Sequence, residues 1–515
     1  MKTVCIIGAG PAGLPAVKEC KKAGLDPICF ERNKSIGGLW AKEQPSDSGI
    51  WEEMTLNASR RWMEYSDFPW NNETVPDPQG RQDLSYGNGV FPHSTEMSDY
   101  LEAYAKNFDL HKHIQLETNV LSTYQNKSTG GWTVVTQPVN GGPETTHEFD
   151  ALIVATGPFH QKFHPLADSL KDFSGELIHS QQLKSVKAFQ GKRVLVVGAV
   201  VSAPQIACDL VEHGGCQQVW SSMRKVPYNL QKVTIDNRPF DDALHIRLPA
   251  WMERVLPEAF MNTGFKKTLL DSFPQLKKSD FCYEDPDEDV TNAGIMVSTN
   301  HVEMVKDEKI RVVPGIASVS GKKITFKDGT SSEFDAVIAC TGYNMSFPFL
   351  PDELQDKLLY SAANGKTEIE LFKETMVPEI PNLAFSGIFY LAGPVPTVVE
   401  MQARFIAATF SGKIQLPSVK TMKQESQAKR VARETSKFKQ FRIVPNVSEE
   451  IGDMLGVTPS LARAFCEPSK YLIAPCYAVQ YRMNPNIDGE EVAREAKERF
   501  ESYLANPQTI KLGKD

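Results

Sequence analysis

One pattern of residues occurs twice in this chain, and it constrains the fold more than any other feature. Residues 4–20 read VCIIGAGPAGLPAVKEC, and residues 194–210 read VLVVGAVVSAPQIACDL. Each copy places a glycine-bearing turn between an apolar, strand-like run and a helical pattern. A further apolar run follows each copy, PICFE at 27–31 and QQVWSS at 217–222. We therefore predict two βαβ units.

A closing strand that ends in Thr-Gly accompanies each unit. Residues 149–157 read FDALIVATG, and residues 334–342 read FDAVIACTG. The chain thus carries two copies of one plan, with one copy inserted inside the other. The predicted fold class is α/β, with two Rossmann-like dinucleotide-binding domains, the second inserted within the first.

The expected domain boundaries follow from this plan. A chain of 515 residues is long enough for two or three domains with cores of their own. The expected segments are the first part of the first nucleotide-binding domain at 1–165, the second nucleotide-binding domain at 166–330, the remainder of the first domain at 331–445 and a C-terminal helical extension at 446–515.

Composition narrows the class of protein. The net charge of -8 argues against a broad surface for nucleic acid or for an anionic membrane. None of the nine cysteines has CxxC spacing, so we expect neither a metal site nor a redox dithiol, and the cysteine usage suggests reduced thiols in a cytoplasmic setting. No stretch approaches the roughly 20 apolar residues that a membrane-spanning helix needs.

The first unit has the features of a dinucleotide site. Gly8, Gly10 and Gly13 lie between a predicted strand and a predicted helix, where glycines allow a tight turn and close approach of the backbone to a pyrophosphate. The helix N-terminus offers N–H donors and partial positive charge to the phosphates. Glu31, 18 residues after Gly13, ends the second strand and can accept hydrogen bonds from both hydroxyls of an adenosine ribose.

FAD is the nucleotide that we expect at this first unit. A free 2′-hydroxyl suits FAD or NAD, and Glu31 would repel a 2′-phosphate. The segment IGGLW at 36–40 brings Gly38, Leu39 and Trp40 close behind the ribose acid, and its glycines allow a further backbone approach along an extended ligand. Thr156 and Gly157, at the end of the closing strand, are expected near the same ligand.

The second unit differs from the first at the end of its second strand, where the adenosine ribose of a nucleotide would bind. Glu31 lies 23 residues after Gly8, and the residue 23 positions after Gly198 is Ser221, so the carboxylate is missing. Arg224 and Lys225 follow shortly afterwards. The missing carboxylate and the added cations favour binding of a ribose 2′-phosphate, so this unit is expected to bind NADPH. Arg224 is the expected main partner of the phosphate, and Ser222 is expected to help bind it.

Val200 is the residue of the second unit that conflicts with this prediction. It occupies the second glycine position, where a side chain keeps the backbone away from a pyrophosphate, and Ala203 occupies the third. The Ser202 hydroxyl could donate to phosphate and partly offset the loss. We expect a displaced or looser cofactor at this unit.

These features together resemble the class B flavoprotein monooxygenases. FSGELIHSQQL at 173–183 is similar to the FxGxxxH fingerprint of that class. Four further segments resemble the flavin-containing monooxygenases in particular: NASRRWMEYSDFPW at 57–70, FDLHKHIQLET at 108–118, CTGYNMSFPFL at 340–350 and EMQARF at 400–405. The resemblance implies that Thr341, Gly342 and Gln402, in the last two of these, contact the cofactors.

Three departures from the family pattern are visible. The fingerprint commonly ends in an aromatic residue, and the corresponding residue is Leu183. The motif GAVVSA at 198–203 is similar to a variant found in microbial members. Microsomal members carry a hydrophobic C-terminal anchor, and this sequence resembles soluble members that lack one.

The resemblance also implies a mechanism. NADPH would pass a hydride to FAD, and the reduced flavin would take up O₂ and form a C4a-hydroperoxide. A soft nucleophile, an amine nitrogen or a sulfur of a small molecule, would then attack the distal oxygen. Asn57 falls where the family has an asparagine near the flavin C4a position, so it is the expected catalytic residue. The protein supplies mainly positioning, hydrogen bonding and exclusion of water.

Other functions remain as alternatives. A Baeyer–Villiger monooxygenase is the nearest, although Leu183 speaks against it. A catalytically impaired NADPH- and FAD-binding redox protein is another, because of Val200. A pyridine-nucleotide disulfide reductase is disfavoured because no CxxC follows the first glycine motif. A homodimer is a reasonable expectation.

Overall fold

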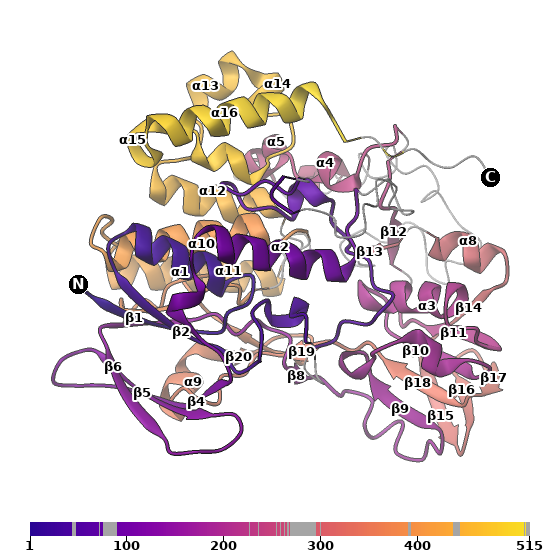
Figure 1. The fold of residues 1–515 in the computed structure, drawn as a ribbon. Coiled ribbons are helices and arrows are strands. Elements are labelled where there is room, and N and C mark those ends of the chain that lie inside the picture. Colours follow the sequence, from indigo (N-terminus) through magenta and orange to yellow (C-terminus); the bar gives the residue numbers. More distant parts are fainter. Residues whose placement is uncertain are drawn as a thin grey trace.

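The fold is described from a computed structural model in which two parallel sheets lie side by side (Figure 1). The described residues are 1–43, 48–71, 73–75, 90–225, 227–234, 236–253, 255–257, 259–261, 263–264, 267, 295–298, 300–389, 393–435, 443–508 and 510.

The first sheet is parallel throughout and has the strand order β22-β7-β1-β2-β3. Its strands are β1 (Thr3–Ile7), β2 (Asp26–Phe30), β3 (Ile114–Gln115), β7 (Ala151–Val154) and β22 (Leu383–Phe385). Helix α1 (Gly13–Lys22) connects β1 to β2 and completes the first βαβ unit as the sequence predicts.

Both faces of the first sheet are covered, which explains why its strands are apolar without alternation. Val4 and Ile6 of β1 belong to one core cluster together with residues of α1, α2 (Ser94–Asn107) and α10 (Pro396–Phe410). Cys5 and Ile7 point to the other face and pack in a second cluster, with residues of an antiparallel sheet formed by β4 (Thr118–Gln125), β5 (Trp132–Pro138) and β6 (Thr145–Phe149).

The second sheet repeats this arrangement with the strand order β14-β11-β10-β18-β9, again parallel throughout. Its strands are β9 (Glu176–His179), β10 (Arg193–Val197), β11 (Gln218–Ser222), β14 (Ile310–Val313) and β18 (Ala336–Ala339). Val194 and Val196 pack with residues of α3 (Ser202–Glu212) and α8 (His301–Lys306), whereas Leu195 faces an antiparallel sheet on the opposite side. That antiparallel sheet consists of β15 (Ile316–Ser320), β16 (Lys323–Phe326) and β17 (Ser331–Glu333).

The order of the strands along the chain confirms that the second nucleotide-binding fold is inserted in the first. All strands of the second sheet lie between β7 and β22, which are neighbours in the first sheet. Strand β18 extends the second sheet to Ala339, past the expected boundary at residue 330. The boundary is therefore corrected to the crossing just after β18, where β19 (Tyr343–Asn344) pairs with β8 (Gln161–Lys162) between the two sheets (Figure 1).

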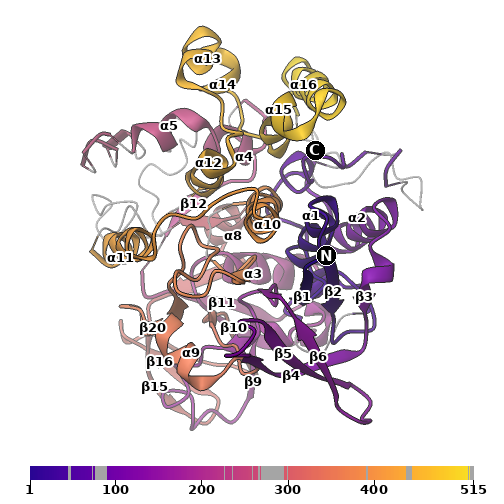
Figure 2. The ribbon, with the colours of Figure 1, turned by 90° about the vertical axis from the view of Figure 1, so that its left-hand side faces the viewer.

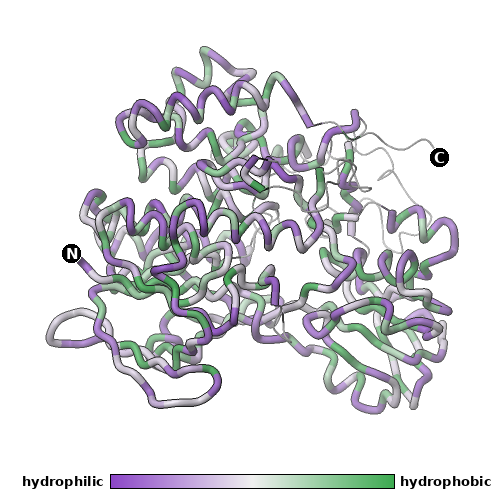
Figure 3. The backbone as a smooth tube through the Cα atoms, in the orientation of Figure 1, coloured by the Kyte–Doolittle hydropathy of each residue, from purple (hydrophilic) through white to green (hydrophobic). Residues whose placement is uncertain are grey.

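Helices from the end of the chain cover the first unit on the side away from the β4–β6 sheet (Figure 2). They are α11 (Val419–Thr435), α12 (Val444–Leu455), α13 (Leu461–Cys466), α14 (Pro468–Tyr471), α15 (Pro485–Asp488) and α16 (Glu490–Ala505). Apolar residues concentrate along the strands of both sheets, whereas the outer helices carry many polar residues (Figure 3).

The remaining elements are short. The helices and 3-10 turns are η1 (Gly38–Trp40), η2 (Arg60–Trp62), η4 (His111–His113), η5 (Ser180–Gln182), η6 (Val186–Phe189), α4 (Phe240–Leu244), α5 (Arg247–Met252), α9 (Asp352–Leu358) and η9 (Ala478–Arg482). The strands are β12 (Tyr228–Leu230), which pairs with β13 (Ile295–Val297), and β20 (Leu359–Ser361), which pairs with β21 (Thr367–Ile369).

Candidate functional site

The glycines of the first unit are required by the close approach of three backbone segments. Gly8 has φ +102°, and a Cβ built on it would lie 2.7 Å from the carbonyl oxygen of Ala155 at the end of β7. A Cβ on Gly13 would lie 1.9 Å from the carbonyl oxygen of Gly8, so α1 can start close to β1 only without a side chain there. The loop therefore lies at the carboxyl ends of β1 and β7, where ligands of open α/β sheets bind.

The turn at Gly38 closes one side of this loop. Cβ atoms built on Gly10 and Gly38 would lie 3.4 Å and 3.1 Å from the Cα of the opposite glycine, and the Gly37 N–H donates to the Ala9 carbonyl oxygen at 2.9 Å. Leu39 and Trp40 follow in η1 and are partly buried. Residues 36–40 therefore lie against the glycine loop, and their contact with an elongated ligand stays a prediction.

Glu31 lies at the end of β2 beside the glycine loop and is only 4% exposed. Its Oε2 accepts a hydrogen bond from the Ala9 N–H at 2.7 Å, and its Oε1 accepts one from the Asn33 N–H at 2.9 Å. Burial raises the pKa of Glu31 above its ordinary value. Each carboxylate oxygen can accept more than one hydrogen bond, so the geometry allows Glu31 to fix the loop and also to accept from a ribose.

Two polar atoms at positions where the sequence predicts a flavin contact are buried without a hydrogen-bond partner among the described residues. They are Oδ1 of Asn57 and Oγ1 of Thr156, which directly follows the end of β7. Buried polar atoms are nearly always hydrogen-bonded in folded proteins, and an unpaired one calls for an explanation such as a missing ligand. A flavin with its ring atoms near these side chains would supply that partner, so the residues present fit FAD.

The second unit reaches a similar turn with different residues. Gly198 has φ +144°, and a Cβ there would lie 2.6 Å from the carbonyl oxygen of Cys340. Helix α3 begins at Ser202, which is exposed, and Ala203 is buried at the third glycine position. Val200 is 57% exposed, so its side chain does not fill the turn itself.

The charged residues at the end of β11 fit a phosphorylated ribose. Arg224 is exposed just beyond the strand, and Ser221, in the position of the missing acid, is fully buried with no partner for its hydroxyl in the described part of the chain. Ser222 departs from its expected role, because its hydroxyl points inward and donates to the Pro314 carbonyl oxygen at 2.9 Å. The three residues before it, Val219 to Ser221, are buried as well, because both faces of this sheet are covered.

Two lysines that the sequence did not single out lie close to Arg224. A Cβ built on Gly315 would contact the side chains of both Arg224 and Lys327, at 3.6 Å and 3.7 Å. A Cβ on Gly342 would lie 2.5 Å from Nζ of Lys366, and burial, with a smaller contribution from the charge of Arg224, lowers the pKa of Lys366. Lys366 lies in the turn between β20 and β21, so no local sequence pattern could associate it with Arg224.

Thr341 and Gly342 lie where the chain leaves the second sheet. The Thr341 hydroxyl donates to the Phe163 carbonyl oxygen at 2.5 Å, and the Gly342 carbonyl oxygen accepts from the Phe163 N–H at 2.9 Å. Nε2 of His179, from the FxGxxxH-like segment, lies 3.1 Å from the same Gly342 oxygen, and burial lowers the pKa of His179 to about 4. These contacts hold the crossing between the two sheets.

Gln402 is fully buried in α10, and the protein itself uses both ends of its amide. Nε2 donates to the Glu374 carbonyl oxygen at 2.6 Å, and Oε1 accepts from the Gly387 N–H at 2.9 Å. A Cβ on Gly387 would lie 2.7 Å from Cβ of Ala12, at the start of α1. The expected cofactor contact of Gln402 is therefore replaced by support of the backbone that packs against the first glycine loop.

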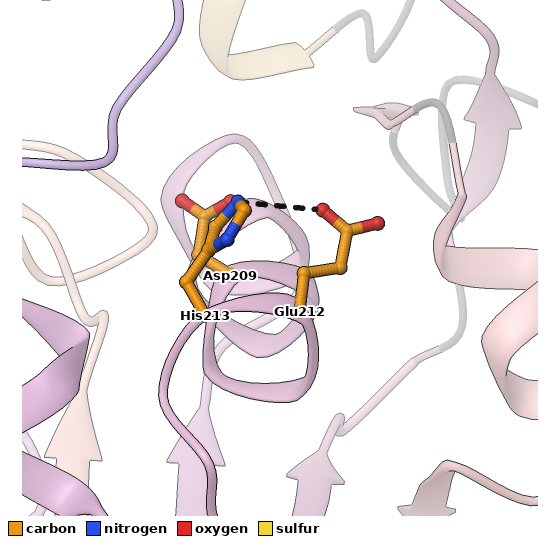
Figure 4. Close-up of side chains that lie close together, drawn as sticks. All are labelled: Asp209, Glu212 and His213. Atoms are coloured by element: carbon orange, nitrogen blue, oxygen red, sulfur yellow. Dashed lines mark ion pairs between the residues drawn. The ribbon is translucent and has the colours of Figure 1, made fainter.

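Groups of acidic residues and histidines away from the glycine loops have partners within the protein. Asp209, Glu212 and His213 lie together at the end of α3 (Figure 4). Nε2 of His213 lies 3.8 Å from Glu212, which also accepts from Asn300 at 3.0 Å. Asp209 is buried and accepts from Trp51 Nε1 at 2.7 Å. Each member of the cluster thus has a partner within the protein.

In the part of the chain that the structure describes, no helix combines the length and the apolar character needed to cross a membrane.

Comparisons with known proteins agree on one family. A family profile described as FMO-like, flavin-binding monooxygenase-like, matches residues 1–497. Flavin-containing monooxygenase 5 of Oryctolagus cuniculus is 30% identical over 514 residues, covering 94% of this chain and 89% of that protein. The N-oxide-forming dimethylaniline monooxygenase 2 of Rattus norvegicus is also 30% identical, over 512 residues, with the same coverage of 94% and 89%.

Solved structures share the fold over most of the chain. The S-allyl-L-cysteine S-oxygenase from Allium sativum superposes with a TM-score of 0.64 at 20% identity and covers 97% of this chain and 99% of its own. A steroid monooxygenase bound to NADP superposes with a TM-score of 0.62 at 18% identity, covering 88% of this chain and 97% of its own. At these identities the likeness shows a common fold.

Proposed function

This chain belongs to the flavin-binding monooxygenase-like family, and from that premise we propose that it uses NADPH and O₂ to oxygenate soft nitrogen or sulfur atoms of small molecules. The overall reaction is NADPH + H⁺ + O₂ + substrate → NADP⁺ + H₂O + oxygenated substrate. It is an oxygenating flavoenzyme, and its cofactors are FAD and NADP(H). The names of two similar proteins, an N-oxide-forming dimethylaniline monooxygenase and an S-allyl-L-cysteine S-oxygenase, support the choice of nitrogen and sulfur.

The difference in charge between the two strand ends carries this proposal. Glu31 ends β2 beside the first glycine loop and suits an adenosine with a free 2′-hydroxyl. At the second loop Ser221 replaces the acid, and Arg224 lies just beyond the strand with Lys366 close by. Cations are what a 2′-phosphate requires, so FAD is assigned to the first unit and NADPH to the second.

The protein's own residues would hold FAD at the first glycine loop. The N–H groups at the start of α1 would donate to the pyrophosphate, and the helix dipole would favour its negative charge. Glu31 would accept from the ribose, and the turn at Gly38–Trp40 would lie along the rest of the ligand. FAD reduced by NADPH supplies the chemistry that activates O₂ and transfers one oxygen atom.

Asn57 is the proposed catalytic residue. Its amide can donate a hydrogen bond through Nδ2 and accept one through Oδ1, and Oδ1 is shut off from solvent and has no partner in the described chain. A ligand group beside it would be held by a fixed dipole in a site from which water is excluded. The route of oxygen transfer that the family resemblance implies is part of this proposal.

A Baeyer–Villiger oxygenation of ketones is the second candidate, because cyclohexanone monooxygenase shares the fold with a TM-score of 0.59. Leu183, at the end of the FxGxxxH-like segment, is 1% exposed and belongs to the core of the second domain. The segment thus lacks the aromatic residue that commonly ends this fingerprint. The proposal therefore favours the oxygenation of nitrogen and sulfur over that of ketones.

The test is a product assay under ¹⁸O₂. Purified protein with NADPH is incubated separately with trimethylamine, methimazole and cyclohexanone, and the products are analysed by mass spectrometry. The proposal predicts one ¹⁸O atom in the amine oxide or the sulfur-oxygenated product and one NADPH oxidised for each. Label in caprolactone alone would establish the ketone reaction instead, and NADPH oxidation that yields only hydrogen peroxide with every substrate would support an impaired redox protein.

A further inference from the structure

The segment that carries Asn57 belongs to the first domain, but residues of the second domain hold it on its N-terminal side. We call residues 51–62 the Asn57 segment. Trp51 Nε1 donates to Asp209 Oδ2 at 2.7 Å, and Gln205 Nε2 donates to the Thr55 carbonyl oxygen at 2.8 Å. Gln205 and Asp209 are one and two turns after Ser202 on the same face of α3. The helix whose first turn faces the proposed NADPH pyrophosphate therefore also contacts the segment that leads to Asn57.

Lys232 adds a second contact immediately before Asn57. It lies between β12 and α4 and is 8% exposed. Its Nζ donates to Oγ1 of Thr55 at 3.2 Å and to the carbonyl oxygen of Leu56 at 3.1 Å. Burying an ammonium group is costly unless it is hydrogen-bonded or paired, so these two bonds fix the backbone one residue before Asn57.

Two neighbouring aspartates hold the other side of the segment. Asp241 in α4 is fully buried, and its carboxyl accepts from the N–H of Ser59 at 2.6 Å and from the Ser59 hydroxyl at 3.0 Å. Asp242, 3% exposed, accepts from Trp62 Nε1 at 2.8 Å and from the hydroxyl of Tyr477 at 2.7 Å. Asn57 thus lies between Leu56 and Ser59, each of which is hydrogen-bonded to a buried ionisable side chain, that of Lys232 or Asp241.

We propose that Lys232 and Asp241 are positioning residues that hold the Asn57 amide in place, as part of a domain clamp consisting of Gln205, Asp209, Lys232, Asp241 and Asp242. All five are at least nine-tenths buried; Gln205 and Asp209 belong to α3, which packs on the second sheet, and the other three belong to the stretch of chain that follows β11. The clamp links the helix at the NADPH loop to the residue beside the flavin. This inference rests on the proposed function only for the role of Asn57, because the contacts of the clamp stand on geometry alone.

The clamp has a chemical consequence. When oxygen is transferred, NADPH, H⁺, O₂ and substrate yield NADP⁺, water and the oxygenated substrate. When Asn57 is misplaced, the same NADPH, H⁺ and O₂ yield NADP⁺ and H₂O₂ instead. Loss of the clamp should therefore raise the ratio of H₂O₂ formed to NADPH oxidised and should leave the amount of bound FAD unchanged.

The first experiment measures hydrogen exchange and does not depend on activity. Backbone exchange of a peptide covering residues 51–62 is followed by mass spectrometry in FAD-loaded wild type, Lys232→Met, Asp241→Ala and Asp241→Asn. Leaving a buried carbonyl or N–H unpaired costs enough to raise local exchange about tenfold. We expect that increase in Lys232→Met and Asp241→Ala. Asp241→Asn should stay near wild type, because Asn can still accept from the Ser59 N–H while it donates to the Ser59 hydroxyl.

The second experiment asks whether the clamp acts through Asn57. As a single substitution, Lys232→Met should raise the ratio of H₂O₂ formed to NADPH oxidised several-fold and should change the KM for NADPH less than twofold. In an Asn57→Ala background, the same substitution should change the ratio no further, because residues that act as a unit are not additive. Lys192→Met, which removes a surface ion pair with Glu176 in the same domain, is the control and should change neither exchange nor coupling.

Unchanged exchange of residues 51–62 in both Lys232→Met and Asp241→Ala would overturn the clamp, as would full additivity with Asn57→Ala. If Asp241→Ala does not fold, Gln205→Leu replaces it and is expected to behave in the same way. A wild type that oxygenates none of the substrates would refute the proposed function but not the clamp, which the exchange measurement still reads.

Discussion

Gly13 has no room for a side chain, because its Cβ would lie 1.9 Å from the carbonyl oxygen of Gly8. The clashing oxygen belongs to the backbone and cannot rotate away, so a side chain at residue 13 would fit only if α1 moved away from β1 and from the pyrophosphate. We predict that Gly13→Ala lowers the FAD content of purified protein at least several-fold, measured as flavin absorbance per protein. Ala203→Gly, at the same position of the second unit, should keep the wild-type FAD content. Equal FAD content in Gly13→Ala and wild type would contradict the assignment of the first loop.

Arg224 is expected to select NADPH over NADH. A charge-assisted hydrogen bond to phosphate is worth about 1.5–3 kcal/mol, so reversing this charge should raise the KM for NADPH by about tenfold or more. We predict that Arg224→Glu removes most of the preference for NADPH and changes the KM for NADH little. Lys323→Glu, an exposed residue of the same domain, is the control. Initial rates with both nucleotides measure the effect, and an unchanged preference would refute the phosphate site.

At the residue scale, sequence reasoning succeeds where a role depends on local spacing. Glu31 and the glycines were predictable because strand, turn and helix fix their positions relative to one another. Ser222 was expected to help Arg224 bind the 2′-phosphate, whereas in the structure its hydroxyl donates to the Pro314 carbonyl oxygen. Lys366 could not be predicted, since tertiary folding alone brings the turn between β20 and β21 to Gly342.

At the scale of elements, α3 combines a nucleotide-facing N-terminus with buried polar residues farther along. Burial raises the pKa of Asp209 from 3.8 to about 7, although its bond from Trp51 and the charge of Lys232 lower it. The folded protein therefore keeps a proton that the unfolded chain has already released between these two pH values. Over that interval the free energy of unfolding falls as pH rises.

We predict that Asp209→Asn removes this part of the pH dependence. Asn cannot titrate and can still accept the hydrogen bond from Trp51 Nε1. Denaturant unfolding at several pH values between 4 and 7 would measure the free energy of unfolding of both proteins. The stability of wild type relative to Asp209→Asn should decrease as pH rises, and parallel curves would show that Asp209 does not keep its proton in the folded state.

The regular elements were predictable because their hydrophobic periodicity is strong. The two βαβ units and the closing strands lie where the pattern placed them. The boundary at residue 330 was misplaced because β18 follows an antiparallel sheet in sequence but belongs to the parallel one. The contacts of the Asn57 segment with α3 and α4 were not predicted, since they join residues roughly 150 to 180 positions apart.

At the scale of the whole molecule, a buried ionic cluster attaches the C-terminal helices to the first unit. Arg482, 1% exposed, bonds to Glu19 of α1 and to Glu400 of α10, and lies 3.3 Å from Asp67. Lys18 contributes a second cation, 2.6 Å from Asp67. Burial alone would raise the pKa of Glu19, but Arg482 and Lys18 lower it below its ordinary value.

Removing Arg482 should destabilise the fold strongly, because it leaves buried carboxylates without their partner. We predict that Arg482→Met lowers the free energy of unfolding by about 3–5 kcal/mol. Arg494→Met, which removes an exposed ion pair with Glu498, should leave it unchanged. Denaturant titration measures both variants. Similar stability of Arg482→Met and wild type would mean that the C-terminal helices are not anchored through this cluster.

The central claim is that the inserted domain delivers electrons from NADPH to a flavin held by the first domain. The most direct test is to mix purified protein anaerobically with NADPH or NADH and to follow the flavin absorbance by stopped flow. The account predicts a yellow protein whose flavin is bleached rapidly by NADPH and much more slowly by NADH at equal concentration. A colourless protein, or a bound flavin that NADPH leaves oxidised, would contradict it.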